Sequence, residues 1–132
     1  MENEQRLPLS AERAKQMNPV TLAFVGDAVY TLLVRTRLTL GSEVKTGELS
    51  RRACEIVSAH AQSGALEGIL PRLTEEEEEI FRRGRNAKKA TKSKNASAGE
   101  YVRSTGFEAL IGYLYLTGRN ARIEELFFGT GV

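Results

Sequence analysis

A long apolar segment that holds a single carboxylate most constrains how this chain can fold. Residues 18–38 read NPVTLAFVGDAVYTLLVRTRL, and Asp27 is the only acid among them. Asn18 suits a helix N-cap and Pro19 the first helical position, where a missing N–H loses no hydrogen bond. Apolar side chains would occupy nearly every face of this helix, which predicts burial on most sides. A buried carboxylate needs a proton, a hydrogen bond or a cation, so Asp27 is the first candidate functional residue. Gly26 beside it is unfavourable in a helix and indicates close approach of another element.

A second apolar segment, residues 101–118, has the same construction. It reads YVRSTGFEALIGYLYLTG and carries one central carboxylate, Glu108, with Gly106 and Gly112 close by. We predict a second buried helix whose acid faces Asp27 across a helix crossing. Paired carboxylates in a helical bundle form sites for hard divalent cations such as Mg²⁺, which prefers oxygen ligands. The alternative is a hydrogen-bonded pair of buried acids, but two like charges close together are destabilising unless a positive charge lies between them.

The positive charge of the chain is concentrated in one stretch. Residues 82–94 hold seven Lys and Arg residues and no acid, so the rest of the chain carries a net charge of −5 although the whole chain stands at +2. This distribution is typical of contact with a polyanion. Residues 84–99 are small and polar without an apolar period, which predicts an exposed, mobile loop. A merely solvated linker is the alternative. The candidate polyanion contacts are Arg82, Arg83, Arg85, Asn86, Lys88, Lys89, Lys92 and Lys94.

Composition excludes several other classes of site. The chain has one cysteine, Cys54, and one histidine, His60, which is too few for a disulfide framework or an ordinary Cys/His zinc site within one chain. Spacing suggests no partner for His60, so we expect it to be a surface or packing residue, and we expect Cys54 in or beside the core. The polar N-terminus and the charges within the apolar runs argue against a signal sequence and against membrane spans. We therefore expect a cytoplasmic protein.

The remaining segments predict short helices and no sheet. A chain of 132 residues should form one domain, here residues 1–132. Thr74 and Glu77 form a capping-box pattern that opens a helix ending near Arg83. No segment shows sustained alternation of β-branched residues, so the expected fold class is all-α. Besides the two apolar segments, the expected helices span residues 10–17, 46–63, 65–70, 74–83 and 120–128, with a break at Gly64.

Three motifs in order resemble the ribonuclease III catalytic domain. They are FVGDAVY at 24–30, GELSRRACEIVS at 47–58 and GFEALIGYLYLTG at 106–118. The short chain, with no double-stranded-RNA-binding domain after these motifs, resembles specifically the mini-ribonuclease III family. The resemblance covers roughly residues 18–128. It implies an all-α homodimer that hydrolyses both strands of an RNA duplex with Mg²⁺, or with Mn²⁺ as a substitute, and leaves short 3′ overhangs. It further implies maturation of the large-subunit (23S) ribosomal RNA precursor, with a ribosomal protein as a candidate helper.

The resemblance also assigns roles to particular residues. Asp27 stands where the family has the aspartate of its GDA motif, and Glu108 where it has the metal-binding glutamate of its FEAL motif, so both are expected to be catalytic and to bind the metal. Residues 82–94 match the basic RNA-contacting loop of the mini family. The larger enzymes have further acids where this chain has Val20, Ala23 and Thr105. With two carboxylates left, we expect weak Mg²⁺ affinity without RNA, and whether one or two metals act stays open.

Two other functions remain open at the level of the sequence. One is a non-catalytic double-stranded-RNA-binding module of the same fold that takes part in ribosome assembly, which the three missing acids favour. The other is an ordinary helical interaction protein whose basic loop is only solvated. Hydrolysis of a phosphodiester by a metal-activated water needs no protein nucleophile, so the lack of a Ser-His-Asp or Cys-His pattern does not argue against a nuclease.

Overall fold

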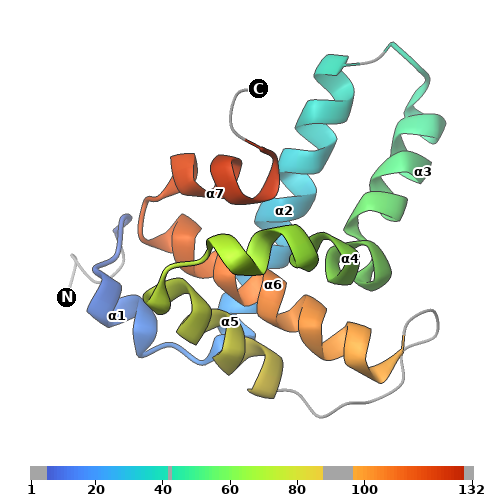
Figure 1. Cartoon of the computed structure of the whole chain (residues 1–132). Coiled ribbons are helices and arrows are strands. Elements are labelled where there is room, and N and C mark those ends of the chain that lie inside the picture. The colour runs from blue at the N-terminus through green and yellow to red at the C-terminus, as the bar shows by residue number, and fades with distance from the viewer. Residues whose placement is uncertain (1–5, 42, 88–96, 130–132) are drawn as a thin grey trace.

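The computed structural model describes residues 6–41, 43–87 and 97–129, and within these ranges the chain forms helices and no strand (Figure 1). The predicted all-α fold class is therefore confirmed. No helix in these ranges is long and apolar enough to cross a membrane. The elements are α1 (Ala11–Lys15), α2 (Pro19–Gly41), α3 (Thr46–Val57), α4 (Ala59–Ile69), the 3₁₀ helix η2 (Leu70–Arg72), α5 (Glu75–Ala87), α6 (Ala98–Leu116) and α7 (Asn120–Phe127).

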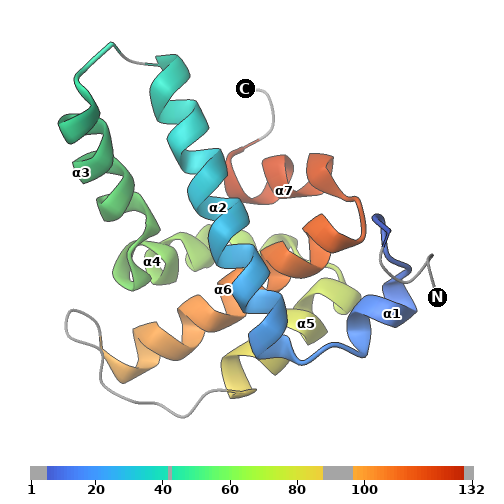
Figure 2. The same ribbon diagram turned by 180° about the vertical axis from the view of Figure 1, so that it is seen from behind.

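Helix α6 forms the centre of the fold. Helix α2 crosses it on one side and helices α4 and α5 pack on the other, as the two opposite views show (Figures 1 and 2). The second apolar segment is thus buried nearly all round, as predicted, because three helices surround it. Its largest fully buried side chains are Phe107, Leu110, Ile111, Tyr113 and Leu114.

Glycines allow α2 and α6 to pack backbone against backbone. A Cβ atom placed on Gly26 would lie 1.8 Å from the carbonyl oxygen of Glu108, and one on Gly112 would lie 1.9 Å from that of Leu22. Real Cβ atoms do not approach a backbone oxygen so closely, so only glycine fits at either position. The close approach predicted from Gly26 is confirmed, and the element that approaches is the backbone of Glu108.

Helix α5 is longer than predicted, and the basic loop is correspondingly shorter. The helix does not end near Arg83 but continues to Ala87, because Gly84 packs against α6 instead of stopping the helix. A Cβ on Gly84 would lie 2.7 Å from the Cβ of Ala109. Helix α6 then begins directly after Ser97, whose hydroxyl accepts a hydrogen bond from the Glu100 N–H at 3.1 Å. The prediction of a loop over 84–99 is therefore wrong at both ends, and residues 88–96 lie outside the described part of the chain.

The break within the expected third helix falls at Ser58 and not at Gly64. Ser58 has extended backbone angles, and its hydroxyl accepts from the Ala61 N–H at 3.1 Å, so it caps α4. A serine hydroxyl competes well for the free N–H groups at a helix start. Gly64 lies inside α4, and a Cβ added there would meet no atom of another segment within 4 Å.

The capping box at the start of α5 is confirmed. The Glu77 N–H donates to the Thr74 hydroxyl at 3.1 Å, and the Thr74 N–H donates to the Glu77 carboxylate at 2.9 Å. Glu77 is only 3% exposed and also accepts two hydrogen bonds from Arg122 of α7, at 2.8 and 2.9 Å. Burial raises the pKa of Glu77, but the hydrogen bonds from Arg122 and Thr74 outweigh it and hold the pKa below its usual value. This ion pair joins α5 to α7.

Candidate active site

The two predicted acids meet where α2 crosses α6. Asp27 follows Gly26 on α2, and Gly26 lies against the backbone of Glu108 on α6. The two carboxyl groups are within hydrogen-bonding range of each other. The fold thus brings Asp27 and Glu108 together. Asp27 itself is exposed and Glu108 is partly buried, so the prediction that Asp27 is buried is wrong. The pair opens to solvent on the α2 side.

The environment of Glu108 favours a proton or a cation at this site. The pKa of the Glu108 carboxyl is raised to about 7, chiefly by burial. The nearby Asp27 charge also raises this pKa, whereas the hydrogen bond from Gln62 lowers it. Taking an ionised carboxylate out of water beside a second carboxylate is unfavourable in the absence of a positive charge. A divalent cation between the two groups would relieve both the burial and the repulsion.

Gln62 on α4 is a third member of the site, and our reading of the sequence did not predict it. Its Nε2 donates to the Glu108 Oε2 at 3.2 Å and to the Val57 carbonyl oxygen at 3.2 Å. A signal was present in the sequence, because Gln62 lies in the i, i+4, i+7 stripe that Leu66 and Ile69 continue on the buried face of α4. A polar residue in such a stripe requires a hydrogen-bonding partner in the core.

The site offers two carboxylates and no larger cluster of ligands. Among the residues that the structure describes, no group of three or more His, Cys, Asp and Glu side chains lies close enough to hold one metal ion. At the positions of the further acids of the larger enzymes, Ala23 is buried and Thr105 donates its hydroxyl to the Tyr101 carbonyl at 3.1 Å. Two carboxylates suit a hard cation such as Mg²⁺, which keeps several waters and takes phosphate oxygens as further ligands. Asp27 and Glu108 would hold such an ion.

The described part of the candidate RNA contacts lies at the end of α5. Arg82 is exposed and pairs with Glu78 at 3.5 Å. Arg85 lies over the Phe81 ring at 5.8 Å, and its Nε donates to the side-chain oxygen of the exposed Asn86 at 3.2 Å. Both remain accessible to a ligand at this end of the helix. Lys88, Lys89, Lys92 and Lys94 lie outside the described residues.

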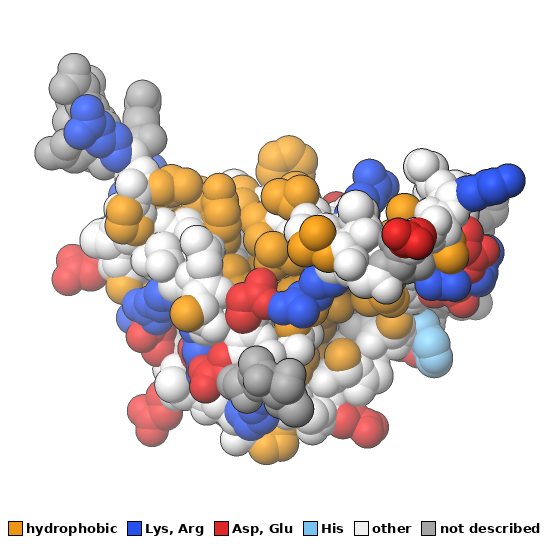
Figure 3. Space-filling model, turned by 90° about the horizontal axis from the view of Figure 1, so that it is seen from above, with side chains coloured by type: hydrophobic (Ala, Val, Ile, Leu, Met, Phe, Trp, Pro, Cys, Tyr) orange, Lys and Arg blue, Asp and Glu red, His pale blue; other side chains and the backbone are white. Residues whose placement is uncertain are grey.

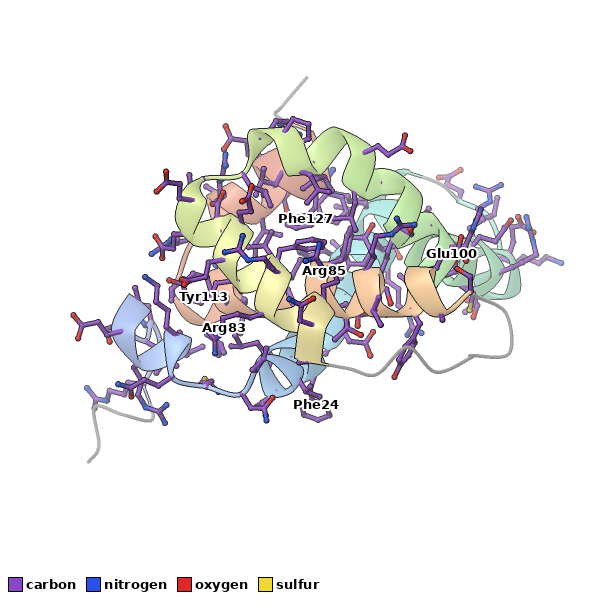
Figure 4. The ribbon with its side chains drawn as sticks, turned by 60° about the horizontal axis from the view of Figure 1, so that its bottom comes forward. Phe24, Arg83, Arg85, Glu100, Tyr113 and Phe127 are labelled. Atoms are coloured by element: carbon purple, nitrogen blue, oxygen red, sulfur yellow. The ribbon has the colours of Figure 1, made fainter. Side chains whose placement is uncertain are left out.

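Arg83 differs from its neighbours because the fold already uses its guanidinium. It points toward α1 (Figure 4), where it donates to the carbonyl oxygens of Lys15 at 3.0 Å and Met17 at 3.4 Å. These are carbonyls at and just after the end of α1, which lack intrahelical partners. Arg83 therefore joins α5 to α1, a role that a run of basic residues in a sequence does not reveal.

The histidine and the cysteine stand apart from the acid pair. His60 is exposed and its Nδ1 lies 2.5 Å from the Glu100 carboxylate, so it has a partner that spacing did not suggest. Cys54 is exposed on α3, and the expectation that it lies in or beside the core is wrong. Neither residue lies in the Asp27 and Glu108 site.

One face of α2 is apolar and exposed, which corrects the prediction that this helix is buried on most sides. Phe24 is 79% exposed and Leu32 is 64% exposed. Phe24 projects away from the body of the molecule in Figure 4, and hydrophobic side chains gather toward the upper part of the view in Figure 3. A groove of about 730 Å³ runs between α2 and α7. Its lining includes Phe24, Asp27, Leu32, Tyr115 and Ile123. We call this surface the α2 groove.

Comparison with known proteins identifies the family. The ribonuclease III domain model matches residues 20–119, a range that contains both Asp27 and Glu108. A mini-ribonuclease 3 from Symbiobacterium thermophilum is 48% identical over 108 residues, which cover 82% of this chain and 83% of the relative. The chain belongs to the mini-ribonuclease III family. Another mini-ribonuclease 3, from Enterococcus faecalis, is 46% identical over 114 residues, covering 85% of this chain and 86% of the relative.

A solved structure agrees with this assignment. The crystal structure of a Fusobacterium nucleatum protein superposes with a TM-score of 0.77 and 27% sequence identity, over 91% of this chain and 95% of that one. The ribonuclease III family consists of endoribonucleases that act on double-stranded RNA and generally use a divalent metal. The resemblance found in the three motifs is thus confirmed, and the interpretation as an unrelated helical interaction protein is set aside.

Proposed function

We propose that this chain is a Mg²⁺-dependent endoribonuclease that hydrolyses double-stranded RNA, with Asp27 and Glu108 as its catalytic, metal-holding residues. The observation that supports this most strongly is the meeting of the two acids at the α2 and α6 crossing, where Gly26 lies against the Glu108 backbone. The basic residues from Arg82 to Lys94 other than Arg83, whose guanidinium joins α5 to α1, bind the RNA phosphates. RNA duplexes are recognised mainly through phosphates and 2′-hydroxyls, which suits a cationic surface more than one built to read base edges.

Each residue of the site has a defined task in this mechanism. When bound, a divalent cation would neutralise charge on the phosphate oxygens and lower the pKa of a water molecule, so that hydroxide would be available to attack phosphorus. Asp27, exposed at the surface, faces the incoming RNA backbone, and Glu108 anchors the site from within. Burial raises the pKa of Glu108 when no cation is present, and a bound cation would favour the ionised form in which Glu108 acts.

A cleavage assay on a long RNA duplex tests this proposal. The wild-type chain should cut with Mg²⁺ and stop when a chelator is added, with Mn²⁺ as a substitute metal. Asp27→Asn should reduce cleavage by at least about 10³-fold while duplex binding persists, because the metal site is lost and the RNA contacts are not. The matched control is Glu67→Gln, which changes an exposed acid of α4 outside the site.

The outcomes of this assay separate the candidate functions. Asp27→Asn activity close to that of wild type would remove Asp27 from the mechanism. Duplex binding by the wild-type chain without any cleavage, at any Mg²⁺ concentration, would favour the non-catalytic RNA-binding module of ribosome assembly. The observation that favours this second candidate is the small number of ligands, because the described residues offer two carboxylates and no larger cluster.

We further propose that the chain acts as a homodimer joined through the α2 groove. Exposed apolar patches of this kind mark protein interaction sites, and Phe24 is an aromatic side chain with nothing from its own chain covering it in the described structure. In a two-fold dimer the Phe24 of each copy can enter the groove of the other, because both contribute the same surface. Asp27 also lines this groove, so the dimer would bring two acid pairs to one face, one for each RNA strand.

The oligomeric state tests this arrangement. In sedimentation experiments the wild-type chain should behave as a dimer, whereas Phe24→Asp should shift it to a monomer that no longer cuts both strands. Leu40→Asp is the matched control, because Leu40 is 83% exposed on the same helix but does not line the α2 groove. The two positions are about 24 Å apart along the helix axis. Monomeric wild-type protein at micromolar concentration would contradict the proposed dimer.

The proposed substrate is the precursor of large-subunit (23S) ribosomal RNA. Membership of the mini-ribonuclease III family supports this assignment. The purified chain should cut precursor transcripts that carry the duplex between the two ends of 23S RNA at discrete positions. The cytoplasmic fraction of cells should cut them at the same positions. A ribosomal protein that binds the same precursor should raise the rate, and equal rates on unrelated duplexes of equal length would contradict this substrate assignment.

A further inference from the structure

Gln62 contacts the Glu108 carboxylate from a third helix, although hydrolysis by the two acids does not itself require it. The side chain is 1% exposed, and its amide nitrogen donates to the Glu108 Oε2 and to the Val57 carbonyl oxygen, both at 3.2 Å. A primary amide has two N–H donors, so each bond can use its own hydrogen. One N–H group of the Gln62 amide is therefore fixed by the backbone, and the other is directed at the carboxylate.

The break at Ser58 explains why the Val57 carbonyl is free to accept. Helix α3 ends at Val57 and α4 begins at Ala59, so the Val57 carbonyl lies in the last turn of a helix, where carbonyls lack intrahelical partners. Ser58 takes the Ala61 N–H with its hydroxyl and the Gln62 backbone N–H with its carbonyl, at 2.9 Å. The orientation of the Gln62 amide is thus set by a backbone carbonyl at the end of α3, five residues before Gln62.

We propose that Gln62 is a positioning residue that orients the Glu108 carboxylate for metal binding. The bond to Oε2 fixes the rotation of the carboxyl group, so that its remaining lone pairs are presented beside Asp27. This inference rests on the proposed function, in which Asp27 and Glu108 share a cation. Partners that orient the ligands of a metal site commonly change its affinity or activity when they are removed.

The oxygen of the same amide argues against a purely structural role. Gln62 Oε1 is buried and has no hydrogen-bond partner among the described residues. Such an unpaired acceptor is destabilising, and an apolar side chain of equal length would avoid it. Packing alone therefore does not explain a glutamine at this buried position. The donated N–H groups do explain it.

Gln62→Met tests the proposal, because methionine preserves length and packing and removes both donors. We expect kcat on duplex RNA and the apparent affinity for Mn²⁺, measured by electron paramagnetic resonance on the full chain, to fall by about 10- to 100-fold. The KM for RNA should stay within about twofold, since no RNA contact changes. The Tm in chelator should stay within about 4 °C of wild type. The matched control is Gln16→Met, which makes the same change at an exposed position after α1 and should alter none of these quantities.

Two results would overturn the positioning role. One is a Gln62→Met variant with wild-type kcat and Mn²⁺ affinity. The other is a loss of kcat that accompanies a larger fall in Tm, because this indicates damage to the core. If Gln62→Met does not fold, nuclear magnetic resonance on the wild-type chain decides. Added Mg²⁺ should shift the Gln62 side-chain amide signals in wild type but not in Asp27→Asn, and unshifted signals in wild type would contradict the proposal.

Asp27→Asn keeps this test separate from that of the proposed function. If Asp27→Asn cuts RNA as well as wild type, the metal site itself is wrong and the role of Gln62 fails with it. If Asp27→Asn is inactive while Gln62→Met cuts normally, the metal site stands and only the role of Gln62 is rejected.

Discussion

At the scale of single residues, Glu108 makes folding depend on pH in a direction opposite to that of most acids. Its folded pKa of about 7 lies above the ordinary value of 4.5, chiefly because burial disfavours the ionised form. The folded chain therefore binds this proton more tightly than the unfolded chain does. The contribution of Glu108 to the free energy of unfolding is therefore fully present below about pH 4.5. It is lost as the pH rises from about 4.5 to about 7.

Glu108→Gln should remove this pH dependence. In the presence of chelator, the variant should gain stability relative to wild type as the pH rises from 5 to 8, by at most about 3 kcal/mol, since one pKa unit corresponds to about 1.4 kcal/mol. Thermal unfolding at a series of pH values measures the difference. Glu67→Gln should follow wild type at every pH. Parallel curves for Glu108→Gln and wild type would show that burial does not disfavour the ionised form of Glu108.

The residues of this site differ in how far the sequence predicts them. Asp27 and Glu108 are recognisable because each is a lone acid in an apolar helix, and such acids need partners. Gln62 is harder to recognise because its function depends on a carbonyl that is free only where Ser58 breaks the helix. A rule based on helical periodicity assumes one continuous helix over residues 46–63, whereas the structure breaks that helix at Ser58. The polar character of one position in a buried stripe is the signal that the sequence does carry.

At the scale of helices, the crossing of α2 and α6 determines whether the two acids meet. Gly26→Ala would place a Cβ against the Glu108 carbonyl, so the helices must separate. Overpacking of this kind should lower the free energy of unfolding by about 1–3 kcal/mol or more, and the displaced Asp27 should lose Mg²⁺-dependent cleavage as well. Denaturant titration and the duplex assay measure the two effects.

Gly68→Ala is the matched control for the helix crossing. Gly68 lies in α4, and a Cβ added there would have no neighbouring atom within 4 Å, so alanine fits without displacing anything. Because glycine is a poor helix former, this change should raise stability by up to about 1 kcal/mol and leave cleavage unchanged. A Gly26→Ala variant as stable and as active as Gly68→Ala would indicate that α2 and α6 do not pack as closely as described.

Glycines also show why helix boundaries are only partly predictable. Gly26 and Gly84 both permit close contact with α6, whereas Gly64 meets open space, yet all three break an apolar or helical pattern in the sequence. Local sequence does not say whether a glycine ends a helix or receives a neighbour, because the neighbour comes from a distant segment. Side-chain caps are more predictable, and those at Asn18 and Thr74 are confirmed because the bonds are formed within four residues.

At the scale of the whole molecule, the exposed face of α2 shows that an apolar sequence does not say whether its own chain or a second copy buries it. The apolar residues of α2 predict burial, and Phe24 and Leu32 are nonetheless exposed. In the proposed homodimer both observations hold, since a second copy covers the face that the first leaves open. The apolar residues on nearly every face of α2 are then buried only in the proposed dimer.

The charge of the molecule separates RNA binding from catalysis. The seven basic residues of 82–94 lie in one stretch of the sequence that contains neither Asp27 nor Glu108, so removing some of them should weaken binding without changing the chemical step. Lys88→Ala combined with Lys89→Ala should raise the KM for duplex RNA and leave kcat nearly unchanged. It should also reduce the salt dependence of binding, by about one unit of slope for each phosphate that is no longer neutralised.

The control for this prediction removes equal charge elsewhere. Arg13→Ala combined with Lys45→Ala also lowers the net charge by two, at exposed positions outside 82–94. If general attraction to a polyanion dominates, both double variants should raise KM equally. If the basic stretch makes direct phosphate contacts, only the change at Lys88 and Lys89 should raise KM and flatten the salt dependence. Steady-state kinetics at several salt concentrations distinguish the two, and an unchanged KM at moderate salt would remove these lysines from the RNA-binding surface.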